Sequence, residues 1–463
     1  MERKYAWHNY DDATMKKVYA LSDTYRQFLD NGKTERECVV QAVEFAEAKG
    51  YVNLNDIIKS NTSIKAGDKI YYTHMDKSIA LFNIGIDDIE LGMNILGAHI
   101  DSPRIDVKQN PQYEDSNLVF WDTHYYGGIK KYHWVAMPLA IHGVVVKTDG
   151  TRININIGDK ETDPVFCITD LLPHLGQEQM QKNAAKVIEG EALDLLIGSR
   201  PVKDEEKEGG TKFINSLLEK EYGFIERDLL SAELEIVPAG KARDMGFDRS
   251  MIMAYGQDDR VCAYTSLVAM LEVDSVKRTT CCLLVDKEEI GSVGATGMQS
   301  RFFENAVAEI LTLMGKPNSV SVRRTLEKSR MLSSDVSAGY DPLYASAYEK
   351  KNASYLGMGV VFNKFTGSRG KTGSNDANAE YMGFIRRVME SNNVTYQTAE
   401  LGKVDLGGGG TIAYIMALYG MNVIDCGVAV LSMHAPWEVT SKADIYEAKQ
   451  CYVAFLNAAD ESI

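Results

Sequence analysis

The stretch TTCCLLVDKEEIG, residues 279–291, places a short apolar run directly before a group of acidic residues. A continuous apolar run with polar ends is typical of a strand buried on both faces of a parallel sheet. Two other stretches share this pattern: MNILGAHIDSP (93–103) and NVIDCGVAVLSMHAP (422–436). Ligands of such sheets bind beyond the carboxyl ends of the strands, so the polar residues there are candidates for a functional site.

Predicted helices lie between these runs. Two of them are RVCAYTSLVAMLE (260–272) and GTIAYIMALYG (410–420). The first ninety residues also read as helical, with a strand only at their end. Within them Thr34 and Glu37 form a capping box, and Gly50 supplies the helix stop. The alternation of apolar strands with helices predicts an α/β fold, in which helices flank a mixed, mostly parallel sheet.

The middle of the chain has a different pattern. Apolar and polar residues alternate in HGVVVKTDGTRININIGD (142–159), and Asp149-Gly150 is typical of a hairpin turn. The charged stretch RPVKDEEKEGGTK (200–212) reads as a solvated loop. Two domains are therefore predicted: a discontinuous α/β domain (1–105 and 243–463) and an inserted β-rich domain (106–242).

Composition excludes several classes of function. The 463 residues include 50 Lys+Arg and 65 Asp+Glu, a formal net charge of −15, and no basic cluster. This balance argues against a nucleic-acid partner. No apolar run is long enough for a membrane span or a signal peptide. The seven cysteines contain no CxxC pair, which favours buried free thiols in a reducing, cytoplasmic setting.

Five sites with side chains of metal-ligand type stand at strand ends or at the start of a helix: His99, the pair Asp258-Asp259, the pair Glu288-Glu289, Asp335 and His434. Each alone has an ordinary structural explanation, such as a histidine near a turn, an acidic helix cap or a solvated acidic turn. Together they form a set of nitrogen and oxygen donors without cysteine. That set suits catalytic Zn²⁺, with Mn²⁺ or Co²⁺ as substitutes. It is too large for one tetrahedral ion and suits two metals that share a carboxylate.

Two further residues are candidates for supporting roles. Asp101 lies two residues after His99, on the same side of the predicted strand, where its carboxylate can orient the imidazole. Glu288 precedes Glu289, so one glutamate can bind metal while its neighbour takes a proton. The chain contains no GxSxG elbow, HExxH motif or Walker A loop that would indicate a competing chemistry.

Five motifs in this order resemble the aspartyl aminopeptidase family, and specifically its bacterial members. They are GAHIDSPRID (97–106), QDDR (257–260), DKEEIGS (286–292), LSSDVSAGYDP (332–342) and SMHAPWE (432–438). The segments YGGI (126–129) and PVFCITDLLPHL (164–175) look similar to the family as well. The resemblance implies a dinuclear zinc metallo-aminopeptidase that assembles from dimers into a dodecamer, with the insert mediating assembly.

The resemblance also implies a role for each residue. His99 and Asp335 would hold one zinc, Glu289 and His434 the other, and Asp258 would bridge them, with Asp259 only a neighbour. Glu288 would act as general base for a hydroxide bridging the metals, and Asp101 would orient His99. His174, in LLPHL, resembles a histidine that a neighbouring subunit lends to the site.

Substrate preference is a separate question. An N-terminal Asp or Glu side chain requires a cation in the pocket, and the candidates in NKFTGSRGKTGSND (363–376) are Lys364, Arg369 and Lys371. The glycine run of KVDLGGGGT (403–411), with Gly408, departs from the eukaryotic aspartyl enzymes and is expected to line the substrate site. The alternatives are a related zinc carboxypeptidase, dipeptidase or amide deacylase, or an inactive scaffold oligomer.

Overall fold

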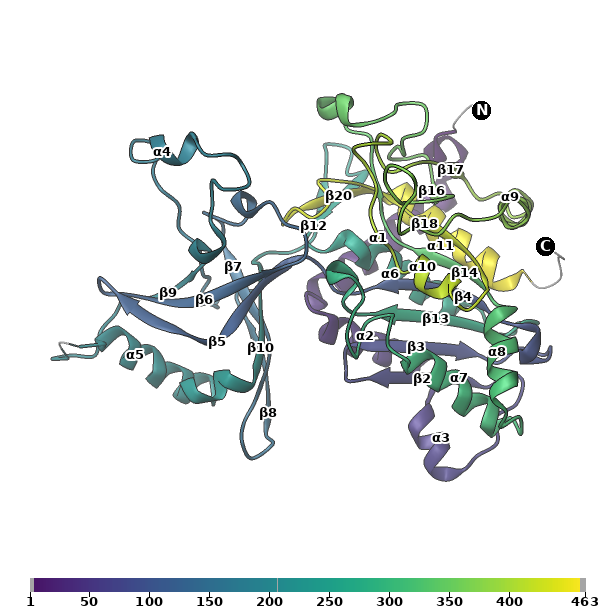
Figure 1. Cartoon of the computed structure of the whole chain (residues 1–463), viewed down its shortest axis with the longest axis horizontal. Helices are drawn as coiled ribbons and strands as arrows, with labels where there is room; N and C mark the ends of the chain where they lie inside the picture. The colour runs from purple at the N-terminus through teal and green to yellow at the C-terminus, as the bar shows by residue number, and fades with distance from the viewer. Residues whose placement is uncertain (1–3, 206, 459–463) are drawn as a thin grey trace. The chain divides into compact units, whose positions relative to one another are not determined.

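The computed structural model describes residues 4–205 and 207–458, which form two compact units (Figure 1). The first unit comprises the described residues up to Asp101, residues 242–433, and the described residues from Glu438 onward. The second comprises residues 102–241 and the short segment 434–437. This segment belongs to the second unit, whereas the sequence placed it in the discontinuous domain. Nothing local in the sequence separates four residues from their neighbours.

A nine-stranded mixed sheet forms the centre of the first unit within the described residues (Figure 1). Its strands are, in spatial order, β1 (Val52–Asn53), β2 (Lys69–His74), β3 (Ser78–Asn83), β13 (Thr280–Val285), β4 (Asn94–His99), β14 (Arg330–Ser334), β18 (Asn422–Gly427), β16 (Val360–Asn363) and β17 (Tyr396–Thr398). The central strands β13, β4, β14 and β18 run parallel. Strands β3 and β16 pair with them antiparallel, so the predicted mixed, mostly parallel α/β sheet is confirmed.

Helices cover both faces of this sheet because its strands are apolar on both sides. Leu96 packs into one core with residues of α1 (Asp12–Asn31), α2 (Glu35–Ala48), α6 (Gln257–Glu272), α9 (Ala379–Ser391) and α11 (Lys442–Asn457). Its neighbour Ile95 packs into a second core with residues of α3 (Leu54–Ser60), α7 (Phe302–Leu313), α8 (Ser319–Glu327) and α10 (Ala413–Ala417). The alternation of side chains along β4 thus divides the interior into two layers.

A five-stranded sheet completes the first unit in the described residues. Its strands are β11 (Arg243–Met245), β12 (Met251–Ala254), β20 (Glu438–Ser441), β19 (Ala429–Leu431) and β15 (Ser337–Ala338). The single strand expected in residues 422–436 is therefore two strands, β18 and β19, in different sheets. The predicted helix at 410–420 is also shorter, because α10 spans only Ala413–Ala417.

The N-terminal part differs in one respect from its sequence-based interpretation. The capping box is present at α2, where Glu37 N donates to Thr34 Oγ1 at 3.2 Å and Thr34 N donates to Glu37 Oε2 at 3.1 Å. The expectation of helices followed by one strand is wrong, because β2 and β3 form a hairpin before β4. Met75 and Asp76 turn this hairpin with positive φ. Asp is a common turn residue but Met is not, and no glycine, asparagine or proline stands beside them, so the sequence gives only a weak hairpin signal here.

The second unit contains a six-stranded antiparallel sheet. Its order is β8 (Arg152–Ile157), β7 (Leu139–Val146), β10 (Ala232–Pro238), β5 (Arg104–Asp115), β6 (Leu118–Tyr126) and β9 (Leu195–Gly198). The expected hairpin is β7–β8, in which Gly150 has a φ of 85° and Asp149 Oδ1 accepts from Thr151 N at 2.8 Å. Two helices, α4 (Gln177–Met180) and α5 (Gly209–Leu217), lie in the connections. Because α5 begins within residues 200–212, the expectation of a loop throughout that stretch is wrong.

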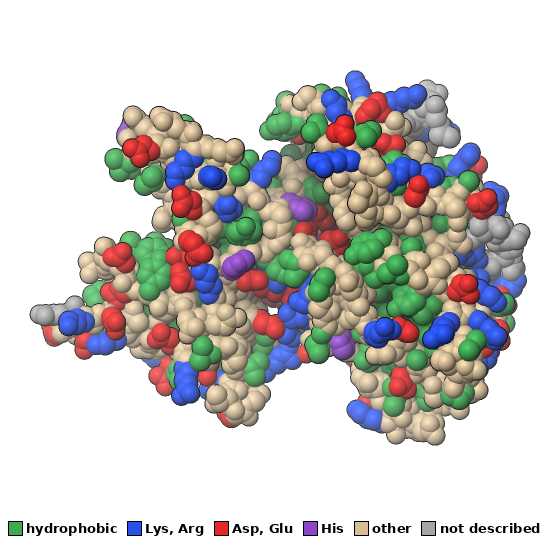
Figure 2. Space-filling model, in the orientation of Figure 1, with side chains coloured by type: hydrophobic (Ala, Val, Ile, Leu, Met, Phe, Trp, Pro, Cys, Tyr) green, Lys and Arg blue, Asp and Glu red, His purple; other side chains and the backbone are tan. Residues whose placement is uncertain are grey.

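Charges of both signs are interspersed on the face of the molecule shown in Figure 2. All seven cysteines are free thiols, and six of them are buried. Among the described residues, no helix has both the length and the apolar character needed to cross a membrane.

Candidate metal centre

The candidate site lies where the parallel strands of the nine-stranded sheet end. His99 is the last residue of β4, and Asp335 directly follows β14. Glu288 and Glu289 begin a short 3₁₀ helix, Glu288–Ile290, after β13, whose Val285 is the register partner of His99. Asp258 lies in the first turn of α6. Parallel strands end at the same edge of a sheet, which brings these side chains together.

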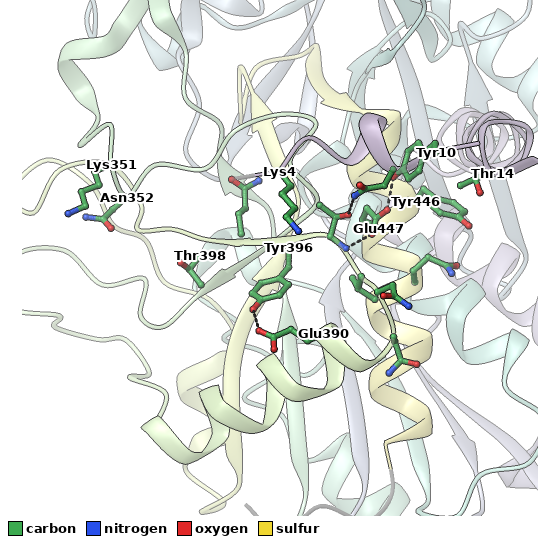
Figure 3. A pocket seen from close by; sticks show the side chains of 17 residues that line it. Lys4, Tyr10, Thr14, Lys351, Asn352, Glu390, Tyr396, Thr398, Tyr446 and Glu447 are labelled. Atoms are coloured by element: carbon green, nitrogen blue, oxygen red, sulfur yellow. Dashed lines mark hydrogen bonds between the residues drawn. The ribbon is translucent and has the colours of Figure 1, made fainter. Parts of the chain in front are cut away.

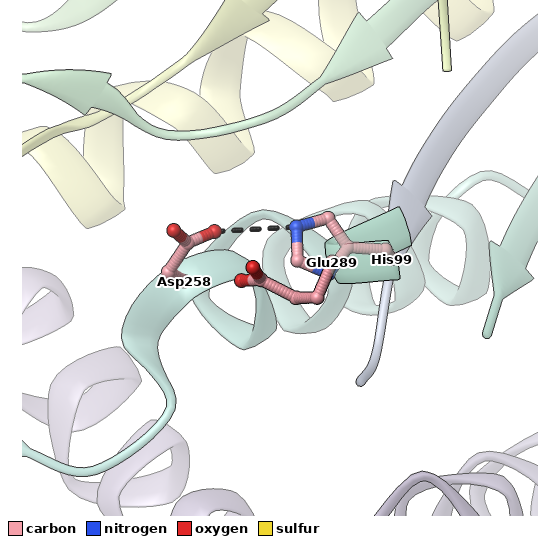
Figure 4. Close-up of side chains that lie close together, drawn as sticks. All are labelled: His99, Asp258 and Glu289. Carbon is pink, nitrogen blue, oxygen red and sulfur yellow. Dashed lines mark ion pairs between the residues drawn. The ribbon is translucent and has the colours of Figure 1, made fainter. Parts of the chain in front are cut away.

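These side chains form a cluster, which consists of His99, Asp258, Asp259, Glu288, Glu289 and Asp335. Figure 4 shows three of them: His99, Asp258 and Glu289. His99 Nε2 lies 3.2 Å from Asp258 Oδ1, and 3.9 Å from both Glu288 Oε2 and Asp335 Oδ1. Three groups of side chains have their ligand atoms within 4.8 Å of one another: His99, Asp258 and Glu289; His99, Glu288 and Asp335; and Asp258, Asp259 and Asp335. This spacing, and the donor chemistry of one imidazole with several carboxylates, fits zinc ions.

Asp259 lies in the cluster beside Asp258, the neighbour that the sequence analysis favours as a ligand. It was treated as a neighbour of the ligands, yet its carboxylate lies in one of the three groups and is fully buried. Burial raises its pKa well above the usual value, and the charge of Asp258 raises the pKa further. Without a cation beside it, the Asp259 carboxyl therefore favours its protonated, neutral form.

Asp101 contacts three residues of the cluster: His99, Glu288 and Glu289. His99 Nδ1 lies 2.9 Å from the Asp101 backbone oxygen and 3.3 Å from its carboxylate. Because both of these oxygens accept, Nδ1 carries a proton, and Nε2, which faces the cluster, is the nitrogen that can offer its lone pair to a metal. The same carboxylate accepts the backbone N–H groups of Glu288 and Glu289, each at 3.1 Å. One buried side chain thus fixes the tautomer of the histidine and the position of both glutamates.

The charges of the cluster are mutually unfavourable without cations. Burial raises the pKa of Asp335 well above its usual value, and the neighbouring Asp259 raises it further. Burial alone would lower the pKa of His99, but contacts with Asp101 and Asp258 raise it well above its usual value. Several carboxylates in a dry site are stable as anions only beside strong positive charge, which divalent metals provide.

Two residues that position the cluster were missed by sequence reasoning. Glu438, at the start of β20, is buried, and its Oε2 accepts from Asp258 N at 2.9 Å. Arg260 is buried as well, and donates to Ile100 O at 3.2 Å and to Lys33 O at 3.0 Å. Both contacts join positions more than 150 residues apart, so no local pattern reveals them. The available signals were their places in quoted motifs: Glu438 in SMHAPWE and Arg260 in QDDR.

His434 and His174 belong to the second unit and are not among the residues of the cluster. His434 Nδ1 donates to the backbone oxygen of Gly128 at 2.8 Å, which leaves the lone pair on Nε2, the tautomer that binds metal. His174 is exposed within residues 165–180, a segment with five exposed apolar side chains: Val165, Leu171, Leu172, Leu175 and Met180.

The three expected pocket cations differ in their surroundings. Lys364 and Lys371 both pair with Asp376, the latter at 2.9 Å. Arg369 has a positive φ of 51°, and its backbone N–H donates to Val404 O at 2.7 Å. The glycine run, including Gly408, lies beside this loop, because Gly409 N donates to Thr366 O at 3.0 Å.

A separate cavity of about 930 Å³ lies in the first unit, next to the N-terminal segment (Figure 3). Tyr10 donates to Glu447 at 2.7 Å in its wall, and Tyr396 donates to Glu390 at 3.1 Å. No residue of the cluster and none of the candidate pocket cations lines this cavity.

Comparison with known proteins is consistent with this geometry. Residues 28–456 match the family model described as "Aminopeptidase I zinc metalloprotease (M18)". A "Probable M18 family aminopeptidase 1" of Clostridium acetobutylicum is 59% identical over 457 residues, 98% of each chain. A crystal structure of an M18 aminopeptidase from Thermotoga maritima has a TM-score of 0.94 and 43% identity, covering 99% of both chains. The yeast mApe1 dodecamer shares the fold. Its TM-score is 0.76 at 18% identity, covering 95% of this chain and 97% of that one.

Proposed function

Because this chain belongs to the M18 family of zinc aminopeptidases and is thus a metal-dependent hydrolase, we propose that it removes N-terminal residues from peptides at the cluster around His99. His99 and Asp335 would hold one of two zinc ions, Glu289 and His434 would hold the other, and Asp258 would serve both. Zinc bound by these donors acts as a Lewis acid and lowers the pKa of water, and Mn²⁺ or Co²⁺ can replace it.

The protein residues supply positioning and proton transfer. Glu288, whose carboxylate lies 3.9 Å from His99 Nε2, accepts the proton of the attacking water and then delivers it to the leaving amine. Asp101 holds Glu288 through the backbone N–H, so that its side chain faces the same space as the ligands. The observation that carries the proposal is this arrangement: one carboxylate orients the histidine ligand and both glutamates.

The decisive experiment measures hydrolysis of substrates with N-terminal Asp, Glu, Leu or Lys. The protein is stripped by chelator, then restored with Zn²⁺, Mn²⁺ or Co²⁺, and Glu288→Gln serves as the inactive control. Metal-dependent release of N-terminal residues, lost in the variant, is the expected result. If metal binds and no N-terminal residue is released, the carboxypeptidase, dipeptidase and deacylase alternatives replace the proposal.

Acidic selectivity depends on the loop of residues 363–376, where Asp376 pairs with two of the three candidate cations. We infer that the pocket accepts an N-terminal Asp or Glu only if a cation reaches the side chain of that residue. The cation would be Arg369, or Lys364 or Lys371 after it has separated from Asp376. The ratio of kcat/KM for N-terminal Glu to that for N-terminal Leu measures this preference directly.

Assembly into a dodecamer built from dimers is proposed from the exposed apolar segment 165–180 and from the yeast mApe1 dodecamer. Leu175 is 69% exposed, and such a group of apolar side chains favours contact with another subunit, to which His174 would extend. Leu175→Asp should reduce the particle mass in analytical ultracentrifugation. Ile86→Asp, a matched control at a position in the first unit that is 72% exposed, should leave the mass unchanged.

The cytoplasm is the proposed location because all seven thiols are free.

A further inference from the structure

Asp425 is a buried carboxylate that the proposed mechanism does not use. It lies on β18, where its register partner on β14 is Ser333, two residues before Asp335. Asp425 is 2% exposed and Ser333 is fully buried. Asp425 Oδ2 and Ser333 Oγ have no hydrogen-bond partner among the described residues. A carboxylate on a central strand is costly, so its presence needs a specific explanation.

One contact from outside the sheet reaches this carboxylate, at its other oxygen. The Thr411 hydroxyl donates to Asp425 Oδ1 at 2.6 Å. Burial raises the pKa of Asp425 to about 7, hydrogen bonds from Thr411 and from its own backbone lower it, and the charge of Glu288 raises it. Its register with Ser333, two residues before Asp335, places Asp425 beside the strand that ends at the candidate metal centre.

Thr411 ends the run of four glycines at 407–410. Gly407 N donates to Lys403 O at 2.7 Å and Gly409 N donates to Thr366 O at 3.0 Å. The N–H groups of Gly408 and Gly410 donate to none of the described residues, and both glycines are exposed. Gly408 has a φ of 116°, and a Cβ there would lie 2.4 Å from Ser368 N, so only glycine fits.

We propose that Asp425 is a positioning residue: it holds Thr411, and Thr411 holds the glycine run at 407–410. The glycine run binds the main chain of the peptide substrate. The free N–H groups of Gly408 and Gly410 would donate to carbonyl oxygens beyond the scissile bond. This inference rests on the proposed aminopeptidase function and specifies how that function selects peptides over small amides.

The test compares two substrates of the metal-loaded enzyme. Leucyl arylamide has no carbonyl beyond the scissile bond. A tetrapeptide that begins with leucine has three, one in each of its remaining residues. Thr411→Val removes the hydroxyl at nearly constant shape and should raise KM for the tetrapeptide about 5- to 10-fold, the loss of about one hydrogen bond. KM for the arylamide and kcat for both substrates should stay unchanged. Thr411→Ser keeps the hydroxyl and should restore the tetrapeptide KM.

A second variant covers the case in which Thr411→Val does not fold. Asp425→Ala removes the acceptor instead of the donor and should give the same substrate-dependent rise in KM. Thermal unfolding, zinc content and particle mass accompany each variant. An equal change for both substrates, or no change in either, overturns the inference. A wild-type enzyme that binds zinc and cleaves neither substrate overturns the proposed function itself, and the inference with it.

Discussion

Replacement of Asp101 by Asn tests whether one carboxylate organises the whole centre. The amide keeps one acceptor oxygen but places an NH₂ group against the backbone N–H of Glu288 or Glu289, both 3.1 Å from the present carboxylate. A hydrogen bond to a charged group contributes about 1.5–3 kcal/mol. Since about 1.4 kcal/mol is a factor of ten, kcat/KM should fall roughly 10- to 150-fold. Zinc affinity, measured by competition with a chelator, should fall about 10- to 100-fold.

Asp444 offers a matched control for this experiment. It is also a fully buried aspartate that accepts two backbone N–H groups, those of Gly357 and Gly359, each at 2.7 Å. It lies at the start of α11 and belongs to none of the metal-ligand groups. Asp444→Asn should lower the free energy of unfolding and leave kcat/KM within about twofold. If Asp101→Asn instead matches the wild type in both kcat/KM and zinc affinity, the organising role of Asp101 is refuted.

Three more results are expected. Glu288→Gln should lower kcat by about 10² to 10⁴ while zinc content, read by elemental analysis, stays at the wild-type level; loss of zinc would show that Glu288 is mainly a ligand. Burial raises the pKa of Asp444 to about 8 from 3.8, so the folded state binds more protons between these values and stability falls as pH rises through them. Denaturant titrations at pH 5 and pH 8 should therefore differ less for Asp444→Asn than for the wild type. Asp376→Asn removes the partner of Lys364 and Lys371 and should raise the Glu-to-Leu ratio of kcat/KM severalfold; an unchanged ratio would exclude these lysines as pocket cations.

Much of the site was predictable from the sequence because it depends on a local pattern. Apolar runs before His99 and Glu288 mark buried strands, and parallel strands end at one edge, so polar residues after them must meet. The grouping of these residues with Asp258 and Asp335 follows from topology. Their individual roles as ligands and base remain predictions that the experiments above test.

The remaining features depend on contacts between distant segments. Glu438 supports Asp258 only because β20 pairs with β12, about 180 residues away along the chain, and strand pairing of this kind has no local signature. The division of residues 422–431 between two sheets is equally hidden, because apolar residues continue on both sides of Gly427. At Gly427 a Cβ would lie 1.9 Å from Asp335 O, which shows how closely the backbones approach there.

The segment 434–437 limits how the chain can be shortened. Its residues pack with the second unit: His434 donates to Gly128 O, and Gly240 lies against the ring of Trp437. The chain therefore passes between the units four times, at residues 101–102, 241–242, 433–434 and 437–438. A gene that lost residues 102–241 would leave a proposed zinc ligand without its anchor. Residues 102–241 therefore cannot be deleted without removing the hydrogen-bond partner of His434 Nδ1.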